Sequence, residues 1–266
     1  MENIAIALLL PLLAGLFTGI GGLIAILTKK PTKTFLAVCL SFAAGVMIYI
    51  SFVEIFHHAR ESLEYAYGYN FGFMLTTLVF FAGIILMAAI DKIVPHKEEL
   101  ADSLAPQQDN KIDKKDRRAL KNMGIMTAIA IAIHNFPEGI VTFVAALHDP
   151  GLGIVIAIAI AIHNIPEGIA VAAPIHYATG NRKKALALSV AAGLTEPLGA
   201  LVAFAFIMHI FNEVVLGIVF AAAGGIMVYI AFNHLLPTAV KFGKHATVMK
   251  GLVAGMAVMA ISLLFI

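Results

Sequence analysis

Long apolar stretches alternate with short polar ones along the whole chain. Eight of these stretches have about 20 residues or more, the length that a helix needs to cross the roughly 30 Å hydrocarbon core of a bilayer. We expect membrane-spanning helices at residues 4–27, 35–59, 70–91, 122–147, 152–178, 184–210, 214–240 and 247–265. The pattern therefore predicts an all-α integral membrane protein with about eight transmembrane helices, forming a single transmembrane domain over residues 1–266.

One polar stretch is longer than the others. Residues 92–121 are rich in Lys, Asp and Gln, which is typical of a flexible loop. The composition agrees with a membrane protein, because 61% of the residues are hydrophobic and 13% are charged, whereas soluble proteins carry roughly 25% charged residues. The net charge of +2 gives no reason to expect a nucleic-acid partner. The single cysteine, Cys39, excludes an internal disulfide framework and a cage of thiolate metal ligands.

Lysine and arginine fall in alternate loops. Of the 18 basic residues, all except Arg60 lie in or beside the connections between spans 1 and 2, 3 and 4, 5 and 6, and 7 and 8. Cytoplasmic loops carry an excess of basic residues, so these four connections are predicted to be cytoplasmic. We expect a multi-pass protein of the inner (plasma) membrane with both termini outside the cytoplasm.

Two internal repeats have inverted topology. Ala128–Ile140 reads AIAIAIHNFPEGI and Ala157–Ile169 reads AIAIAIHNIPEGI, on the adjacent and oppositely directed spans 4 and 5. Gly45–Phe52 reads GVMIYISF on span 2, and Gly225–Phe232 reads GIMVYIAF on span 7. Spans 1–3 and 6–8 are thus inverted repeats around the 4–5 pair. This arrangement is typical of alternating-access transporters with a binding site near the bilayer midplane.

Ionisable residues lie at the predicted midplane of spans 4, 5 and 6. Each charged side chain there costs roughly 2.5–3.5 kcal/mol, and no Lys or Arg lies at that depth to compensate the glutamates. Either protons or a cation must neutralise them. In each repeat His and Glu are four residues apart and project from one helical face, with Asn beside them. The candidate metal ligands are His134, Asn135, Glu138, His163, Asn164, Glu167 and Glu196.

The types of ligand indicate the type of ion. Imidazole nitrogen combined with carboxylate and amide oxygen suits Zn²⁺, Fe²⁺, Mn²⁺ or Co²⁺, whereas an all-oxygen site favours Mg²⁺ or Ca²⁺. The repeat between spans 2 and 7 aligns Glu54 with His234, which is preceded by Asn233. Glu54 is expected on the outer side of the midplane and His234 on the inner side, as ligands of the pathway. The alternative is that all three are ordinary polar residues near helix ends.

At these residues the sequence resembles the ZIP (Zrt-, Irt-like) family of metal transporters, in particular its bacterial ZupT-like branch, over essentially the whole chain. The resemblance implies a binuclear metal centre and broad import of Zn²⁺, Fe²⁺, Mn²⁺, Co²⁺ and Cd²⁺, with no organic cofactor. The first site it implies consists of His134, Glu138, His163 and Glu167. The second consists of Asn135, Glu138, Asn164, Glu167 and Glu196.

The sequence departs from the family pattern in two places. The 92–121 loop holds only His96, so the histidine-rich loop of many eukaryotic members is missing. Asn233 and His234 stand where relatives often carry acidic residues. The resemblance therefore does not identify the ligands on the inner side of the pathway.

Two other functions use the same ligands. A membrane-embedded metal-dependent enzyme would need a nucleophile or base beyond the ligands, and the chain has no HExxH motif. A metal-selective channel would share the ligands but not the alternating access. Small-residue pairs, Gly15/Gly19 and Gly251/Gly255, are explained by close helix packing, with a homodimer interface as the second interpretation.

Overall fold

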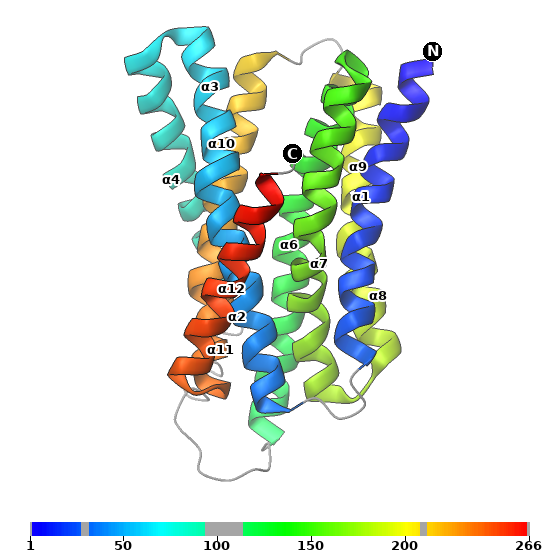
Figure 1. Ribbon diagram of the computed structural model, residues 1–266, viewed down its shortest axis with the longest axis vertical. Coiled ribbons are helices and arrows are strands. Elements are labelled where there is room, and N and C mark those ends of the chain that lie inside the picture. The colour runs from blue at the N-terminus through cyan, green and yellow to red at the C-terminus, as the bar shows by residue number, and fades with distance from the viewer. Residues whose placement is uncertain (1, 28–31, 94–113, 208–211, 265–266) are drawn as a thin grey trace.

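The computed structural model describes residues 2–27, 32–93, 114–207 and 212–264, and no strand occurs in these ranges. Figure 1 shows long helices that run along the long axis of the molecule. The helices are α1 (Glu2–Leu27), α2 (Lys33–Ile50), η1 (Ser51–Ile55), α3 (Phe56–Tyr67), α4 (Tyr69–Ile93), α6 (Lys114–His148), α7 (Pro150–Thr179), α8 (Arg182–Gly193), α9 (Thr195–Val202), η2 (Ala203–Ile207), α10 (Glu213–Ile230), η3 (Ala231–Leu235), α11 (Leu236–Phe242) and α12 (His245–Leu263).

Eight helical stretches are long and apolar enough to cross a membrane, which confirms the predicted all-α integral membrane protein. The described spans are Asn3–Leu27, Lys33–Tyr67, Tyr69–Lys92, Leu120–Leu147, Gly153–Thr179, Arg182–Ala205, Glu213–Phe242 and His245–Leu263. Three of them are assembled from several helical segments: α2, η1 and α3 form the second, α8, α9 and the start of η2 form the sixth, and α10, η3 and α11 form the seventh.

Two predicted boundaries were wrong. The second span was expected to end at residue 59, but α3 continues to Tyr67 because ion pairs one helical turn apart support its polar sequence. Arg60 Nε lies 2.6 Å from Glu64 Oε1, for example. The predicted 92–121 loop is shorter at its second end, since α6 begins at Lys114. Residues 94–113 of that predicted loop, including His96, lie outside the described residues.

Local signals explain where several helices begin and end. Asn181 and Asn212 lie just before α8 and α10, and each side chain accepts a hydrogen bond from a backbone N–H of the first helical turn. Gly68 and Gly180 follow α3 and α7 with φ of 80° and 68°, a conformation that costs glycine little.

A π-helical turn follows each of the helices α2 and α10, and the two turns, η1 and η3, occupy equivalent positions of the repeat between spans 2 and 7. The Phe56 N–H donates to the Ser51 carbonyl, and the Leu236 N–H donates to the Ala231 carbonyl, five residues back in each case. Turns of this kind are rare and are frequently found at functional sites. The repeat that the sequence predicted therefore extends to the backbone geometry of the two spans.

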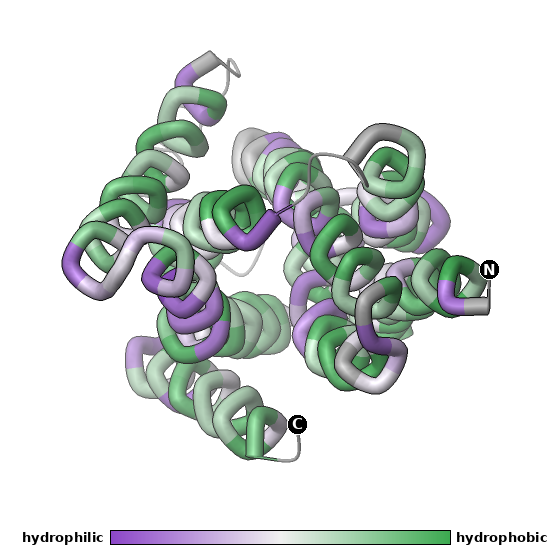
Figure 2. The backbone as a smooth tube through the Cα atoms, turned by 90° about the horizontal axis from the view of Figure 1, so that it is seen from above, coloured by the Kyte–Doolittle hydropathy of each residue, from purple (hydrophilic) through white to green (hydrophobic). Residues whose placement is uncertain are grey.

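The helices form two bundles (Figure 1). In the first, which we call the motif bundle, α1, α6, α7, α8 and α9 pack together. In the second, the flanking bundle, α2 packs on α12 and α11, and α10 packs on α3 and α4. The bundles meet mainly where α2 contacts α7 and α10 contacts α6. Figure 2, seen along the helices, shows hydrophobic residues over most of their length.

Candidate metal centre

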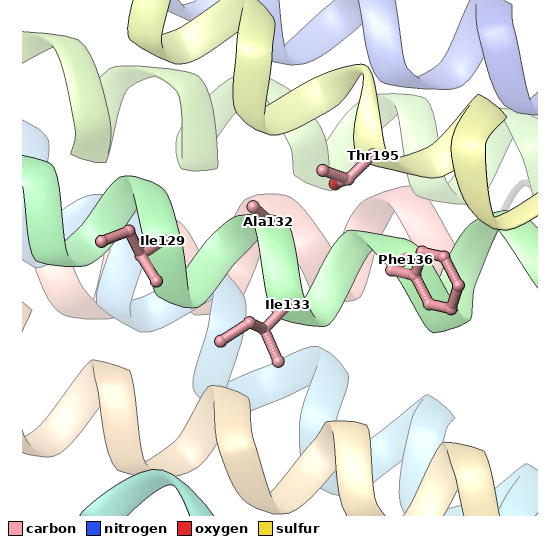
Figure 3. Close-up of a pocket in the computed structure, with 5 residues that line it drawn as sticks. All are labelled: Ile129, Ala132, Ile133, Phe136 and Thr195. Carbon is pink, nitrogen blue, oxygen red and sulfur yellow. The ribbon is translucent and has the colours of Figure 1, made fainter. Parts of the chain in front are cut away.

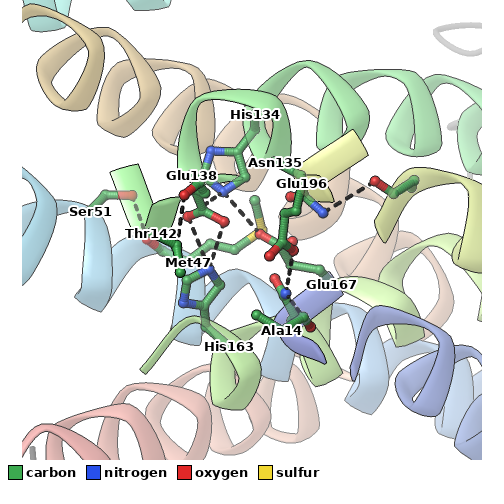
Figure 4. Close-up of polar contacts among 12 residues, drawn as sticks. Ala14, Met47, Ser51, His134, Asn135, Glu138, Thr142, His163, Glu167 and Glu196 are labelled. Atoms are coloured by element: carbon green, nitrogen blue, oxygen red, sulfur yellow. Dashed lines mark hydrogen bonds and ion pairs between the residues drawn. The ribbon is translucent and has the colours of Figure 1, made fainter. Parts of the chain in front are cut away.

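The histidines and glutamates of both repeated motifs converge where α6 and α7 pack side by side (Figure 4). His134 and Glu138 come from α6, His163 and Glu167 come from α7, and at most 4% of any of the four is exposed. His134 Nε2 lies 3.1 Å from Glu138 Oε1 on its own helix and 3.3 Å from Glu167 Oε1 on the other. The i, i+4 spacing predicted the first contact, and the packing of the two helices produces the second.

Glu138 faces both histidines. Its Oε1 lies 3.0 Å from His163 Nε2 across the helix interface, and its Oε2 lies 3.3 Å from the same nitrogen. One ligand atom from each of His134, His163 and Glu167 lies within 4.8 Å of the other two. The four side chains therefore form one compact cluster of nitrogen and oxygen atoms.

Asn164 and Glu196 extend this cluster towards α1 and α9. Asn164 Nδ2 donates to Glu196 Oε1 at 2.5 Å and to the Ala14 carbonyl of α1 at 2.9 Å. Glu196 lies in the first turn of α9 and is fully buried. The structure thus brings the candidate carboxylate of span 6 to the motif residues, as the sequence analysis expected.

Asn135 lies between the Ala192 carbonyl of α8 and Glu167. Its Nδ2 donates to the Ala192 carbonyl at 3.3 Å, which turns its Oδ1 towards Glu167. Flipping the amide, so that its nitrogen and oxygen change places, would instead let Nδ2 donate to Glu167 Oε2 and to the Ile131 carbonyl, both at 3.1 Å. In the first orientation two acceptor oxygens face each other, and a cation between them would turn this repulsion into attraction.

Several polar atoms of the cluster are buried without a hydrogen-bond partner among the described residues. Such atoms are rare in folded proteins, because each costs about 1–3 kcal/mol of desolvation. No lysine or arginine of the described part is buried, so neither of these side chains compensates the three glutamates. The donor set fits a divalent cation. The atoms are His134 Nδ1, His163 Nδ1, Asn164 Oδ1 and Glu196 Oε2, to which His134 Nε2 and Glu167 Oε1 are added as atoms at ion-pair distance without hydrogen-bond geometry.

Met47 is a further residue at this site, and the sequence analysis did not identify it. It is fully buried on α2, and in Figure 4 its thioether side chain points towards the cluster. The neighbouring Ser51 hydroxyl donates to the Met47 carbonyl at 2.6 Å. Met47 belongs to the repeat Gly45–Phe52, so the available signal was a methionine at a repeated position of a membrane span.

Glu54 lies on η1, far from the motif residues in the sequence. Its side chain contacts His58, one helical turn further along on α3. Its Oε1 lies 3.0 Å from His58 Nε2, and about a third of its side chain is exposed (32%). His58 Nδ1 lies 3.4 Å from Glu61 Oε2. The predicted outer ligand is thus part of a chain of His and Glu side chains along α3, beyond the central cluster.

Asn233 and His234 belong to a second polar cluster, centred on Asp91 at the end of α4, in which Asp91 and His234 are buried and Asn233 is exposed. Asp91 Oδ2 accepts from the Tyr229 hydroxyl at 2.8 Å and from Asn233 Nδ2 at 3.1 Å, and its Oδ1 lies 3.4 Å from His234 Nε2. The sequence analysis missed Asp91 and Tyr229. A carboxylate near the end of a span was the only signal for Asp91, whereas Tyr229 lies within a repeat.

A groove of about 440 Å³ lies between α6 and α9 (Figure 3). The residues that line it are neighbours in sequence of the candidate metal ligands. Four of its five lining residues lie on the face of α6 opposite to His134 and Glu138, and the fifth lies on α9. Only one of them carries a polar side chain, so the groove offers no ligands for a cation. The lining residues are Ile129, Ala132, Ile133, Phe136 and Thr195.

Comparison with known proteins agrees with this geometry. A family model described as "ZIP Zinc transporter" matches residues 3–118 and 91–263. The "Zinc transporter ZupT" of Clostridium perfringens is 50% identical over 277 residues, covering 99% of this chain and 97% of the relative. Those of Streptococcus mutans and Oceanobacillus iheyensis are 50% identical (99% of this chain, 98% of the relative) and 48% identical (100% of both).

Proposed function

This chain belongs to the ZIP zinc transporter family, and from this membership we propose that it imports divalent metal ions, Zn²⁺ above all, through a binuclear centre between α6, α7 and α9. The relatives are transporters and not enzymes, so the chemistry required of the centre is reversible binding. The metal ion is the substrate of this process.

The observation that carries the proposal is the spacing of the ligand atoms. In a tetrahedral zinc site with bonds of about 2.0–2.2 Å, neighbouring ligand atoms lie about 3.3–3.6 Å apart. The Nε2–Oε1 separations of 3.0, 3.1 and 3.3 Å among His134, His163, Glu138 and Glu167 are close to these values. The site would bind an ion with only small side-chain movements.

The same ligands support a second ion beside the first. Asn135, Asn164 and Glu196 add three oxygen donors. Glu167, which faces both His134 and Asn135, would bridge the two sets together with Glu138. Three carboxylates have a charge of −3 when ionised, which two divalent cations would more than balance. One ion would have mixed nitrogen and oxygen ligands, and the other mainly oxygen ligands.

The ligand types also support transport of related metals. Nitrogen and oxygen donors bind Fe²⁺, Mn²⁺ and Co²⁺ as well as Zn²⁺, and the thioether of Met47 is a soft donor that suits Cd²⁺. We therefore propose Zn²⁺ as the main substrate, with Fe²⁺, Mn²⁺, Co²⁺ and Cd²⁺ as further ones.

The direction of transport is proposed from the distribution of charge. The connections rich in Lys and Arg join helix ends at one end of the molecule, whereas Arg60 lies on α3 at the other (Figure 1). The positive-inside rule makes the basic end cytoplasmic, in the plasma membrane, with both termini outside. Glu54 then lies on the outer route to the centre, and the Asp91, Asn233 and His234 cluster lies on the inner route.

Alternating access would follow from the two-bundle architecture. Every candidate ligand of the motifs, and Glu196, belongs to the motif bundle, while Met47 and the outer and inner polar residues belong to the flanking bundle. Movement of one bundle against the other would change which side of the membrane the centre faces.

Uptake into proteoliposomes tests the proposed function. Purified protein is reconstituted into vesicles that contain a fluorescent zinc indicator, and the initial rate is measured against external Zn²⁺. We expect saturable uptake in the wild-type protein and none above protein-free vesicles for Glu138→Gln, at equal reconstitution. Equal uptake by both would contradict the proposed centre. A rate that rises linearly without saturation would instead indicate a channel.

A further inference from the structure

A third inverted repeat links α1 to the helices that carry Glu196. Ala14–Gly21 reads AGLFTGIG and Ala192–Gly199 reads AGLTEPLG, and their offset along the chain is close to the offset between the repeated segments of spans 2 and 7. In this alignment Thr18 takes the place of Glu196. The question is whether the two positions are also equivalent in space.

The crossing of α6 with α9 depends on two glycines. A Cβ on Gly139 would overlap the carbonyl oxygen of Glu196, and a Cβ on Gly199 would overlap the carbonyl oxygen of Phe136. Each glycine lies three residues after the carbonyl that the other glycine contacts. The two backbones can therefore touch, and this contact holds Glu196 against the first motif.

The crossing of α7 with α1 repeats this pattern. A Cβ on Gly168 would overlap the carbonyl oxygen of Thr18, and a Cβ on Gly21 would overlap the carbonyl oxygen of Ile165. The spacing of three residues is the same on both helices. Thr18 is thus held against the second motif in the way that Glu196 is held against the first.

The two asparagines obey the same symmetry. Asn164 Nδ2 donates to the Ala14 carbonyl of α1, and Asn135 Nδ2 donates to the Ala192 carbonyl of α8 (Figure 4). Ala14 and Ala192 are the first residues of the two aligned segments, and each lies four residues before the position in question. The Ala14 carbonyl of α1 and the Ala192 carbonyl of α8 therefore play equivalent roles next to the metal centre.

A glycine of the neighbouring helix faces the Thr18 side chain, and another faces that of Glu196. A Cβ on Gly15 would lie 3.5 Å from Glu196 Cβ, and a Cβ on Gly193 would lie 2.9 Å from Thr18 Cβ, so a glycine leaves room beside each side chain. Thr18 is fully buried, and its Oγ1 has no hydrogen-bond partner among the described residues. Its hydroxyl is a buried oxygen at a position where the symmetric counterpart is a candidate ligand.

We propose that position 18 is the counterpart of Glu196 and sets the charge on the Asn135 side of the oxygen-rich ion position. Threonine leaves this side without a carboxylate, whereas Glu196 supplies one on the Asn164 side, so position 18 limits the charge and the affinity of that ion position. This inference rests on the proposed function, since it assumes that the centre binds metal.

Moving the carboxylate from position 196 to position 18 tests the proposal. Zn²⁺ binding to purified protein is measured by calorimetry for the wild type, for Glu196→Thr, and for the double variant Thr18→Glu/Glu196→Thr. We expect Glu196→Thr to lower the affinity or the number of bound ions, with a loss of about tenfold to a hundredfold in affinity. The double variant should recover most of this loss, because its carboxylate can reach the centre from the Asn135 side.

Thr127→Glu/Glu196→Thr is the matched control. Thr127 is also fully buried with an unpartnered hydroxyl among the described residues, but it lies seven residues before His134 on α6 and has no symmetric relation to Glu196. Recovery in the control as well would overturn the proposal, since any buried negative charge would then suffice. A folded swap variant without recovery would also overturn it.

Thr18→Asp in the wild-type background provides a second test, because aspartate has nearly the volume of threonine. We expect tighter Zn²⁺ binding by about tenfold or more and slower uptake, since a fourth carboxylate retains the ion. An unchanged affinity would contradict the inference. If the wild-type protein itself binds no Zn²⁺, the proposed function fails first, which separates the two failures.

Discussion

His163 Nε2 and Glu138 Oε1 lie 3.0 Å apart, although the residues belong to different motifs and are 25 positions apart in the chain. The same carboxylate oxygen lies 3.1 Å from His134 Nε2. Glu138 therefore joins the two motifs into one site, and its carboxylate is the group that both histidines share. The consequences of removing it should differ from those of removing a carboxylate at the edge of the cluster.

We predict that Glu138→Gln lowers Zn²⁺ affinity by about a hundredfold, towards the upper end of the effect of altering a metal site. Glu196→Gln should have a smaller effect, because Glu196 contacts Asn164 and neither histidine at hydrogen-bonding distance among the described residues. Calorimetry on both variants at matched folding would check this order. A larger loss for Glu196→Gln would mean that the primary ion binds nearer to α9.

The sequence was sufficient to predict the motif residues but not all of their contacts. The i, i+4 spacing places His134 and Glu138 on one face of α6 whatever the tertiary structure. The contact between Glu138 and His163 depends instead on how α6 and α7 rotate against each other, which is decided by packing. Glu196 was found because a buried carboxylate at midplane depth is costly and calls for a partner.

The residues that the sequence analysis missed have weaker signals. Asp91 and Tyr229 meet across 138 positions of the chain, and each alone is an ordinary residue of a span. Thr18 was hidden because its repeat shares only the pattern AGL and a final glycine with Ala192–Gly199, and because threonine does not look like a ligand. The equivalence of positions 18 and 196 becomes visible only in the structure, where Gly168 packs on the Thr18 carbonyl as Gly139 packs on the Glu196 carbonyl.

Zn²⁺ binding should release protons and weaken at low pH. The two histidines and the carboxylates coordinate metal only when deprotonated, so protons compete with the ion. We expect Zn²⁺ affinity to fall between about pH 7.5 and about pH 5.5, across the usual range of histidine titration. Calorimetry in two buffers of different ionisation enthalpy would give the number of protons released. Identical apparent heats in both buffers would contradict the prediction.

Gly139→Ala should disturb the centre through packing alone. The added Cβ would overlap the Glu196 carbonyl oxygen, so α9 must move away or the protein loses stability, by about 1–3 kcal/mol for a typical overpacked site. We expect a lower thermal midpoint together with weaker Zn²⁺ binding. Gly151→Ala is the control, because its Cβ would meet only the Asp149 Oδ1 side-chain atom at 3.2 Å. Wild-type stability and binding in Gly139→Ala would show that α6 and α9 need not touch.

His234→Ala should slow uptake severalfold and leave Zn²⁺ affinity at the centre unchanged. His234 contacts Asp91 in the flanking bundle and belongs to the proposed inner route, so its loss affects release of the ion. Phe232→Ala, on the same π-helical turn but with an exposed side chain, is the matched control. Proteoliposome uptake and calorimetry on the same preparations would separate rate from affinity. A loss of affinity in His234→Ala would place this residue in the centre.

Asn135→Asp is predicted to change the ranking of transported metals more than it changes folding. One end of the Asn135 side-chain amide faces Glu167 Oε2, and its nitrogen would lie 3.1 Å from that oxygen in the flipped orientation, so an aspartate there puts a further negative charge beside a carboxylate. A cation bound between the two oxygens would then be attracted more strongly, and hard ions such as Mn²⁺ and Fe²⁺ should gain relative to Cd²⁺, which benefits from softer donors.

Competition between these ions and Zn²⁺ during uptake would measure the ranking. Asn212→Asp is the matched control, because Asn212 caps α10 by accepting from the Val215 N–H and aspartate can do the same. It adds the same charge outside the centre and should leave the ranking unchanged. If Asn135→Asp kept both the affinity and the ranking of the wild type, the oxygen-rich half of the centre would not select the ion. Selection would then rest with the histidines and Met47.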